Sequence, residues 1–571
     1  EEVDFSNDKD NSQSVNVVIV NEINSDIIKE ISTSSEYSFY ISDCAVCLFN
    51  GNTEYEFPLQ VSLLEQGLTA TEIINALSFI FMGNKTLTVF DKKAFKHLLK
   101  KSFAMDLLAP IEDVSLMKYL CDFAGKAETA EEVFLFYGLE NKPKAYALYT
   151  IKNNLLQKLQ SEQTLDLYKN VELPLSDVLY EMEVSGFKID SESLYQTGKV
   201  YATKLAELEE KIKQLTGEEN LNVNSPKQLG EVLFEKLKIG KGKKTKTGYS
   251  TKVDVLEALE DAHPVIPFIL NYRRLQKLYS TYIEGFKPLI EKSTGLIHTS
   301  FNQTVTSTGR LSSKEPNLQN IPVRDDEGKE LRKFFVPKSQ DRILVGADYS
   351  QIELRLLAAF SNCKSLITAF RNEEDVHTET AAKVFKVKKD EVTSNMRRQA
   401  KAVNFGIIYG ISEYGLAKNI GVSPRTAKEY IDSYFATYPE VKAYIDKNVE
   451  SAKLKGYAET ILNRKRVIRE LNSSNYALRS FGERAAMNMP LQGSSADIIK
   501  VAMINVYNRL KKEGLKSELI LQVHDELIID AFKSEQQIVE RILKEEMENA
   551  VTLSVPLTVE IGSGENWFDA K

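Results

Sequence analysis

The 571-residue chain is too long for a single hydrophobic core, which predicts about two to four domains. Its composition, 43% hydrophobic and 27% charged, is typical of a globular protein, and no apolar run approaches the roughly 18 residues of a membrane span. The four cysteines fit a reduced, cytosolic setting. Cys44 and Cys47 form a CxxC pair that could suit zinc or redox chemistry, but no second pair or nearby His completes a metal site.

The net charge of −8 would argue against a nucleic-acid partner if it were spread evenly, but it is not. Residues 1–150 contain 12 basic and 23 acidic residues, whereas the rest of the chain holds 61 basic and 58 acidic. The stretch KIGKGKKTKTGYSTK at 238–252 has six lysines, three glycines and no acid, which predicts a flexible loop. It lacks P-loop spacing, so it is either a solvated loop or a contact with a phosphate backbone.

In chain order, a polar leader at 1–15 comes first, without Met or a signal peptide, so we expect a fragment of a longer protein. From there to about residue 170, β-like runs alternate with helical stretches, which predicts an α/β domain. The β-like runs lie at 15–20, 37–42, 45–49 and 86–90.

From about 171 to 290 the pattern is helical, with a long amphipathic run at 195–217 and a helix start at Ser225–Pro226. Residues 300–342 are rich in Gly, Pro, Asn and Ser and predict loops and short strands. A strand then leads into DYS at 348–350, followed by a mainly helical region to about 510. SELILQVHDELIID at 517–530 predicts two strands that meet at His524–Asp525.

Three acids lie at the ends of these apolar strands. Asp348 ends one buried strand, and Asp525 and Glu526 lie at the junction of two others, where an unpaired carboxylate is costly. Each alone could be a turn residue with satisfied hydrogen bonds, but together they predict a divalent-cation site. Oxygen ligands without a Cys or His cluster indicate Mg²⁺, and two such ions can activate a hydroxyl and stabilise a phosphate leaving group.

The helix RRQAKAVNFGIIYG at 397–410 predicts two distinct faces. Cations and aromatic rings share one face, which would suit a polyphosphate next to a sugar and base: Arg397, Lys401, Phe405 and Tyr409. The other face is apolar and predicts core packing: Ala400, Val403 and Ile407. Gly406 would let a backbone or base approach closely. The alternative is an ordinary solvent-exposed helix, which would leave two rings unburied.

Three motifs, DYSQIELR at 348–355, RRQAKAVNFGIIYG at 397–410 and QVHDE at 522–526, resemble the signature motifs of family A DNA polymerases. The likeness extends to FNQTVTSTGRLSSKEPNLQNIPVR at 301–324, RAAMNMPLQGSSADIIK at 484–500 and GSGENWFDAK at 562–571. It runs from about residue 171 to 571 and is strongest to the large, Klenow-type fragment of bacterial enzymes of the Bacillus type.

The resemblance implies a multidomain α/β and α+β chain: a right-hand polymerase with palm, fingers and thumb behind an N-terminal 3′–5′ exonuclease-like α/β domain. The implied boundaries are 16–170 for the exonuclease-like domain, 171–299 for the thumb, 300–357 and 476–571 for the palm, and 358–475 for the fingers. It also implies a monomer in the bacterial cytoplasm, at the nucleoid and without a membrane. Its partners would be primer–template DNA and deoxynucleoside triphosphates, its cofactors two Mg²⁺ ions, and its work DNA repair and replication.

The resemblance also implies roles for individual residues. Catalysis would rest on Asp348, Asp525, Glu526 and Lys401, with Asp348 and Asp525 holding the metals. The incoming nucleotide would contact Arg397, Lys401, Phe405, Tyr409, His377, Glu353 and Gln351, with Glu353 and Tyr409 together blocking a ribose 2′-hydroxyl. Primer and template would contact Arg310, Arg484, Asn488, Gln492, His524, Arg273, Arg274 and Lys277.

The N-terminal domain departs from the family pattern. The Asp-x-Glu expected of a proofreading exonuclease aligns with Tyr40 and Ser42, and the Asp of Tyr-x-x-x-Asp aligns with Thr150. Asp91 alone survives, and one carboxylate cannot hold two metals, so we expect no proofreading.

Three alternatives to a DNA polymerase without proofreading remain: a polymerase with a working exonuclease, a single-subunit RNA polymerase, and a catalytically dead DNA-binding scaffold. Glu353 argues against the RNA polymerase, and the intact Asp348 and Asp525 argue against the scaffold.

Overall fold

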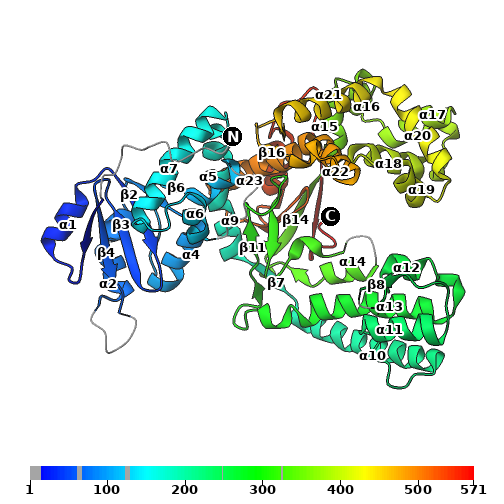
Figure 1. Ribbon diagram of the computed structural model, residues 1–571, viewed down its shortest axis with the longest axis horizontal. Coiled ribbons are helices and arrows are strands. Elements are labelled where there is room, and N and C mark those ends of the chain that lie inside the picture. The colour runs from blue at the N-terminus through cyan, green and yellow to red at the C-terminus, as the bar shows by residue number, and fades with distance from the viewer. Residues whose placement is uncertain (1–14, 61–66, 122–128, 247, 323–325) are drawn as a thin grey trace.

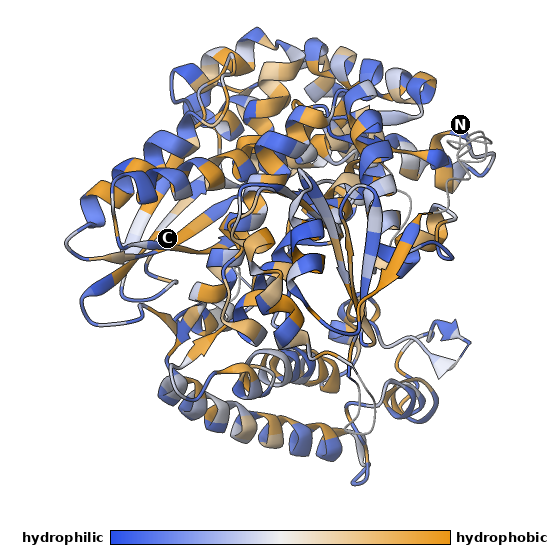
Figure 2. Ribbon diagram, turned by 90° about the vertical axis from the view of Figure 1, so that its left-hand side faces the viewer, coloured by the Kyte–Doolittle hydropathy of each residue, from blue (hydrophilic) through white to orange (hydrophobic). Residues whose placement is uncertain are grey.

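The computed structural model describes residues 15–60, 67–121, 129–246, 248–322 and 326–571, so the predicted polar leader lies almost wholly outside the described residues. Figure 1 shows an N-terminal domain at the left and two helical arms at the right, with strand β14 near the centre. No helix among the described residues combines the length and apolar character needed to cross a membrane. Figure 2 shows helices with alternating hydrophilic and hydrophobic segments, the pattern of helices that bury one face.

The N-terminal domain contains a six-stranded sheet in the order β1-β4-β3-β2-β5-β6. All four predicted β-like runs form strands, and two further strands complete the sheet: β1 Asn16–Ile19, β2 Glu36–Ile41, β3 Ala45–Phe49, β4 Thr53–Pro58, β5 Thr86–Val89 and β6 Ile111–Asp113. Strand β4 escaped prediction because Glu54 and Glu56 alternate with its buried rings, Tyr55 and Phe57. The helices of the N-terminal domain are α1 Ser25–Ser32, α2 Ala70–Ala76, α3 Ser78–Phe81, α4 Lys92–Phe103, α5 Val114–Cys121, α6 Ala130–Phe136, α7 Lys144–Ser161 and α8 Leu165–Leu167.

The first arm, which we call the α10–α13 arm, is built on two long packed helices. Its helices, with α9 leading into them, are α9 Leu173–Ser185, α10 Ser191–Thr216, α11 Pro226–Glu231, α12 Val253–Glu257 and α13 Val265–Leu278. The Ser225 side chain caps α11, as the sequence predicts. The basic stretch is not a plain loop, because β8 (Lys244–Thr245) pairs with β9 (Gly248–Tyr249) and the Tyr249 ring packs 5.2 Å from that of Phe234.

The second arm, which we call the α15–α22 arm, is almost entirely helical. Its elements are α15 Ile352–Ser361, α16 Lys364–Arg371, α17 Val376–Phe385, α18 Ser394–Ile408, α19 Glu413–Ile420, α20 Pro424–Thr437, α21 Pro439–Lys455, β15 Tyr457–Glu459, β16 Lys465–Val467 and α22 Tyr476–Asn488. The side chains of Thr393, Ser412 and Ser423 cap three of these helices by accepting a backbone N–H. Such caps fix where the helices begin.

A four-stranded antiparallel sheet, the central sheet, lies where the arms meet, in the order β17-β18-β14-β19. Its strands are β14 Arg342–Tyr349, β17 Glu518–Val523, β18 Glu526–Phe532 and β19 Val559–Gly564, and the helices near it are α14 Asp326–Arg332, α23 Ser494–Lys512 and α24 Gln536–Glu548. A hairpin of β11 (Ser300–Asn302) and β12 (Ser312–Lys314) lies before it in the chain. A small sheet of β10 (Leu296–Ile297), β7 (Phe187–Ile189) and β13 (Phe335–Val336) links it to the α10–α13 arm.

Four charged side chains form a buried cluster where these parts join: Glu172 before α9, Arg464 before β16, and Asp497 and Lys500 on α23. All are 1% exposed or less. Arg464 donates from Nε to Asp497 over 2.8 Å and from its other end to Glu172, which also accepts from Lys500 over 2.7 Å. Burial would raise the pKa of Glu172, but Lys500 and Arg464 hold it at about 2, so the carboxylate stays charged.

Because the charges in the cluster neutralise one another, removing one leaves another buried without its counter-charge. We expect Arg464→Met to lower the free energy of unfolding by about 3–5 kcal/mol. Lys442→Met is the matched control, since Lys442 pairs with Asp446 on an exposed helix face and should change little. Urea unfolding followed by circular dichroism measures both, and equal stability of the two variants would contradict this account.

Candidate active site

Two carboxylates that are far apart in the sequence meet at one end of the central sheet. Asp348 pairs with Glu526 in the register of β14 and β18, and Asp525 occupies the turn between β17 and β18. The backbone N–H of Tyr349 donates to the Asp525 carbonyl over 3.2 Å, which fixes this turn beside the end of β14. The Ser495 hydroxyl on α23 donates to Oδ1 of Asp525 over 3.0 Å. The structure therefore brings the two predicted metal-binding aspartates to one edge of the sheet.

The carboxyl group of Asp348 lies in a strongly negative environment. Burial and the charges of Glu526, Asp525 and Glu560 raise its pKa to about 6, against the opposing effect of Lys571. The Lys571 ammonium nitrogen lies 3.8 Å from Oδ2 of Asp348. Carboxylates that repel one another and offer only oxygen donors fit a hard divalent cation such as Mg²⁺. Among the described residues, no group of three or more His, Cys, Asp or Glu side chains could hold a metal, so a cation here would also need oxygens from its substrate.

Glu526 lies behind this pair rather than beside it at the surface. Its side chain accepts a hydrogen bond from the Trp567 indole N–H over 3.2 Å, and an Arg332 guanidinium nitrogen lies 3.8 Å away. The same guanidinium stacks 4.2 Å from the Trp567 ring centre. Glu526 is 3% exposed, and burial raises its pKa. It adds negative charge to the site from within the protein.

Glu353 joins α15 to the end of α18. One oxygen of its carboxylate accepts from the Tyr409 hydroxyl and the other from the Arg310 guanidinium, each over 2.9 Å. Burial raises the pKa of Glu353, and burial together with that carboxylate raises the pKa of Tyr409 to about 12, so the phenol keeps its proton. The result is a fixed polar wall close to Asp525, whose negative charge also raises the pKa of Glu353.

The two faces of α18 have different surroundings. The apolar stripe is buried: Ala400 at 0%, Val403 at 1% and Ile407 at 3% exposed. On the other face Arg397 and Lys401 are exposed and Phe405 is half-buried, whereas Tyr409 follows the last helical residue as the C-cap. The expectation for Gly406 is wrong, because a Cβ there would lie 2.5 Å from the Ile411 side chain. Gly406 therefore makes room for this packing and not for a ligand.

His377 on α17 is buried beneath the exposed face of α18. Its Nδ1 lies 3.0 Å from the Asn404 amide nitrogen, which donates to it, so the neutral ring carries its proton on Nε2. Its ring centre is 5.9 Å from that of Phe405. Burial lowers the pKa of His377 to about 4, even though Asp375 opposes this. Asp375 itself accepts from Arg397 over 2.6 Å, which joins the two helices.

The remaining predicted contacts around the carboxylates are half-buried or lie in turns. Gln492 is within hydrogen-bonding reach of the Tyr409 hydroxyl. Within the described chain, Asn488 Oδ1 and Gln351 Oε1 are buried without a hydrogen-bond partner. Arg484 donates to Ser480 over 2.8 Å, and His524 has a φ of +54° in the turn beside Asp525.

The predicted contacts on the α10–α13 arm separate into two groups. Arg274 and Lys277 are exposed on α13. Arg273 is half-buried and donates to both the carbonyl and, over 2.9 Å, the hydroxyl of Thr251. Burial also lowers the pKa of Arg273. The structure therefore does not bring Arg273 to the exposed face with the other two, and its DNA contact stays a prediction.

The exonuclease-like positions of the N-terminal domain make structural contacts. Tyr40 donates its hydroxyl proton to the Glu131 carboxylate, and Asp91 caps α4 by accepting a backbone N–H over 2.8 Å. The Thr150 hydroxyl donates to the Tyr146 carbonyl over 3.0 Å, within its own helix. The one surviving carboxylate is thus occupied by helix capping.

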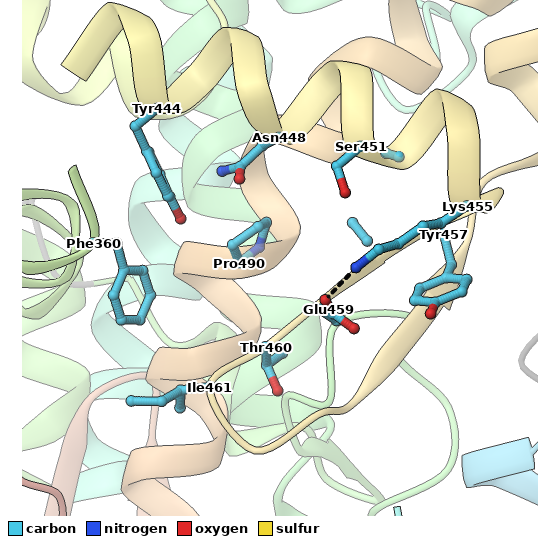
Figure 3. A pocket seen from close by; sticks show the side chains of 12 residues that line it. Phe360, Tyr444, Asn448, Ser451, Lys455, Tyr457, Glu459, Thr460, Ile461 and Pro490 are labelled. Atoms are coloured by element: carbon cyan, nitrogen blue, oxygen red, sulfur yellow. Dashed lines mark hydrogen bonds and ion pairs between the residues drawn. The ribbon is translucent and has the colours of Figure 1, made fainter. Parts of the chain in front are cut away.

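A cavity of about 210 Å³ lies between α21, β15 and the π-helical turn η10 (Met489–Gly493), and Figure 3 shows its side chains. Its wall includes an ion pair between Lys455 and Glu459, with Nζ and Oε1 2.8 Å apart. None of its lining residues is a predicted site residue. A smaller recess of about 30 Å³ is lined by Arg310, His524 and Asp525, among others, and is the one next to the carboxylates.

An antiparallel sheet with two aspartates at one end, placed where two helical arms meet, is the architecture of the right-hand polymerase fold. The chain belongs to DNA polymerase family A, whose profile matches residues 191–569. The predicted family and the right-hand fold are therefore confirmed.

The chain is 52% identical over 428 residues to DNA polymerase I of Bacillus subtilis (strain 168), a match that covers 75% of this chain and 48% of that protein. It is 50% identical over 469 residues to DNA polymerase I of Caldicellulosiruptor bescii, covering 81% and 55%. The chain thus spans about half the length of these curated relatives. The solved POL domain of Pol1 from M. smegmatis, in complex with DNA primer–template and dNTP, superposes with a TM-score of 0.86 at 35% identity, over 95% of this chain and 98% of that chain.

Sequence reasoning missed several residues that shape the site. Ser495 orients Asp525, Lys571 lies near Asp348, and Arg332 with Trp567 surrounds Glu526. Ser495 sits in the motif QGSSADIIK, which gave a signal for the neighbourhood but not for the contact. Trp567 and Lys571 likewise lie in the motif GSGENWFDAK, whereas Arg332 comes from a segment without a motif, and only the folded sheet brings the three to the carboxylates.

The burial of His377 predicts an unusual titration. Its signal in an NMR spectrum of histidine-labelled protein should not move between pH 7.5 and 5.5, whereas an ordinary His titrates near pH 6.5. The unfolded chain takes up this proton near pH 6.5 and the folded chain only near pH 4. The free energy of unfolding should therefore decrease as the pH falls from 6.5 to 4, by about 3 kcal/mol from this group. The chain has five His residues, so His377→Gln identifies the signal, and a midpoint near 6.5 would contradict the prediction.

Proposed function

We propose that this chain is a template-directed DNA polymerase that adds deoxynucleoside triphosphates to a primer 3′ end by two-metal phosphoryl transfer, in DNA repair and replication. The observation that carries this proposal is the meeting of Asp348 and Asp525 at the end of the central sheet. The name DNA polymerase I for the relatives, and the primer–template and dNTP in the M. smegmatis structure, support it.

Asp348 and Asp525 would hold two Mg²⁺ ions. The donor set fits, because both are carboxylates and the pKa of Asp348, about 6 through burial and neighbouring acids, indicates uncompensated negative charge. Bound there, Mg²⁺ would lower the pKa of the primer 3′-hydroxyl and neutralise charge on the triphosphate. Ser495 keeps the Asp525 carboxylate in place, and Glu526 adds charge from behind.

The exposed face of α18 would bind the incoming nucleotide. Arg397 and Lys401 meet the triphosphate, and Lys401 stabilises the charge that develops on the leaving group. Phe405 packs on the sugar, and the Nε2 proton of buried His377 next to it can donate to a phosphate oxygen. Phosphoryl transfer depends mainly on such positioning and charge neutralisation.

The pair of Glu353 and Tyr409 would select deoxyribose. Their hydrogen bond and the bond from Arg310 fix a wall with little freedom to make room for a 2′-hydroxyl. Gln351 follows Ser350 at the start of α15 and offers a buried oxygen near this wall.

Primer and template would lie across the central sheet and along the α10–α13 arm. The contacts near the new pair come from Arg310, Arg484, Asn488, Gln492 and His524, and those farther along from Arg274 and Lys277. Such contacts must be indifferent to sequence in a copying enzyme, which suits phosphates and shared minor-groove acceptors. The central sheet would correspond to the palm, residues 358–475 of the α15–α22 arm to the fingers and the α10–α13 arm to the thumb, with the boundaries predicted above. We place the monomer in the bacterial cytoplasm, at the nucleoid.

Extension of a labelled primer on a DNA template with Mg²⁺ tests the function. We expect full-length product with dNTPs, little with rNTPs, and at least a thousandfold slower extension by Asp525→Ala, a loss of about 4 kcal/mol in transition-state stabilisation. Lys442→Met, a change on an exposed face of α21, should extend normally. Efficient use of rNTPs would instead favour the RNA polymerase alternative, and no extension at all would favour the dead scaffold.

We further propose that the N-terminal domain has no proofreading activity, since the predicted positions carry Tyr40, Ser42 and Thr150 and Asp91 caps a helix. A 5′-labelled primer with a mismatched 3′ end, incubated with Mg²⁺ but without nucleotides, should keep its length. Shortening that persists in Asp525→Ala would contradict this, because it would come from a site other than the palm.

A further inference from the structure

The loop of the β11–β12 hairpin, residues 303–311, carries Arg310 and has little support from its own backbone. Apart from a turn at 307–308, residues 303–311 adopt no regular secondary structure. Its centre is exposed, with Val305 at 56%. The conformation of this loop, and so the position of Arg310, depends on side-chain contacts.

The two ends of the loop rest on the buried cluster. The Gln303 amide donates to Oε2 of Glu172 over 2.7 Å and to its carbonyl over 2.9 Å. At the other end Gly309 has a φ of +84°, and a Cβ there would lie 2.5 Å from Nε of Arg464. The residue before Arg310 is thus pressed against a guanidinium that is itself held by two carboxylates.

The middle of the loop is held by the N-terminal domain. The hydroxyl of Tyr119, on α5, donates to the Thr306 carbonyl over 2.7 Å, and the Thr306 hydroxyl donates to the Arg310 carbonyl over 2.6 Å. Arg310 then donates to Glu353, which accepts from Tyr409. Tyr119 is 8% exposed, and burial raises its pKa to about 12, so it remains a hydrogen-bond donor at every working pH.

We infer that Tyr119 is a positioning residue for sugar selection: it holds the 303–311 loop so that Arg310 keeps Glu353 in place as the barrier to a 2′-hydroxyl. The inference rests on the proposed function and deepens it. It gives the N-terminal domain a part in polymerisation that needs no metal and no exonuclease chemistry. Tyr119 touches neither substrate nor metal and acts through the loop.

The test is the ratio of dNTP to rNTP incorporation at one template position, measured as kcat/KM for each nucleotide. Tyr119→Phe removes one hydroxyl and should lower this ratio by about threefold to tenfold, the range that one lost hydrogen bond produces. Thr306→Ala, a change in the loop itself, should lower it in the same way, so the test does not depend on one variant folding. Most of the change should lie in faster rNTP use rather than slower dNTP use.

Tyr37→Phe is the matched control. Tyr37 is a buried tyrosine of the same domain whose hydroxyl donates to the Ile31 carbonyl over 3.0 Å, away from the loop. It should lose comparable stability in thermal unfolding and leave the nucleotide ratio unchanged. An equal fall of the ratio in Tyr37→Phe would mean a general loss of stability and overturn the inference.

A double-mutant comparison tests the route. If Tyr119 acts through Glu353, Tyr119→Phe should have no further effect on the ratio in a Glu353→Gln background. An unchanged ratio in the single variants, or an equal fall with and without Glu353, would overturn the inference while leaving the polymerase function intact. If the unaltered chain incorporated no dNTP, the proposed function would fail, and this inference with it.

Discussion

The pairing of β14 with β18 is the constraint on which the site depends. In its register Asp348 lies opposite Glu526 and next to the turn that carries Asp525. Side chains alternate across a strand, so a slip of one residue would turn Asp348 to the other face and separate the two aspartates. The register is held by apolar pairs along both strands, such as Val345 with Ile529, each fully buried. The chemistry of the acids is thus fixed by the packing of residues that take no part in it.

The buried cluster of Glu172, Arg464, Asp497 and Lys500 performs a similar task between domains. It joins a residue before α9, one between β15 and β16, and two on α23, so three parts of the chain must come together before all of the charges are satisfied. Such a cluster need not add net stability over apolar packing. What it does is penalise every arrangement in which one partner is displaced. The 303–311 loop contacts two members of this cluster, Glu172 and Arg464, so the cluster also fixes the position of the loop.

Much of this could be predicted from the sequence, because the relevant signals are local. The period of two in 342–348 gives β14, the split face of 397–410 gives α18, and Ser225–Pro226 gives a helix start. Two predictions were wrong for reasons that only tertiary structure supplies: the packing of Ile411 against Gly406, and the β8–β9 pair inside the lysine-rich stretch. Contacts between distant segments gave no signal at all, and Tyr119 meets a carbonyl 187 residues later in the chain.

The N-terminal domain lacks the carboxylates expected of an exonuclease but keeps its structural contacts with the rest of the chain. Its exonuclease-like positions now serve capping and packing, and its charge is strongly acidic, which does not favour contact with DNA. Yet it makes specific polar contacts with the rest of the molecule, among them Lys93 donating to the Phe301 carbonyl over 2.6 Å and Lys92 to Asp177 over 2.6 Å. A domain retained only as an inert appendage would need none of these. Lys92 thus contacts α9, whereas Lys93 and Tyr119 contact the β11–β12 hairpin, so the domain supports the hairpin whose loop carries Arg310.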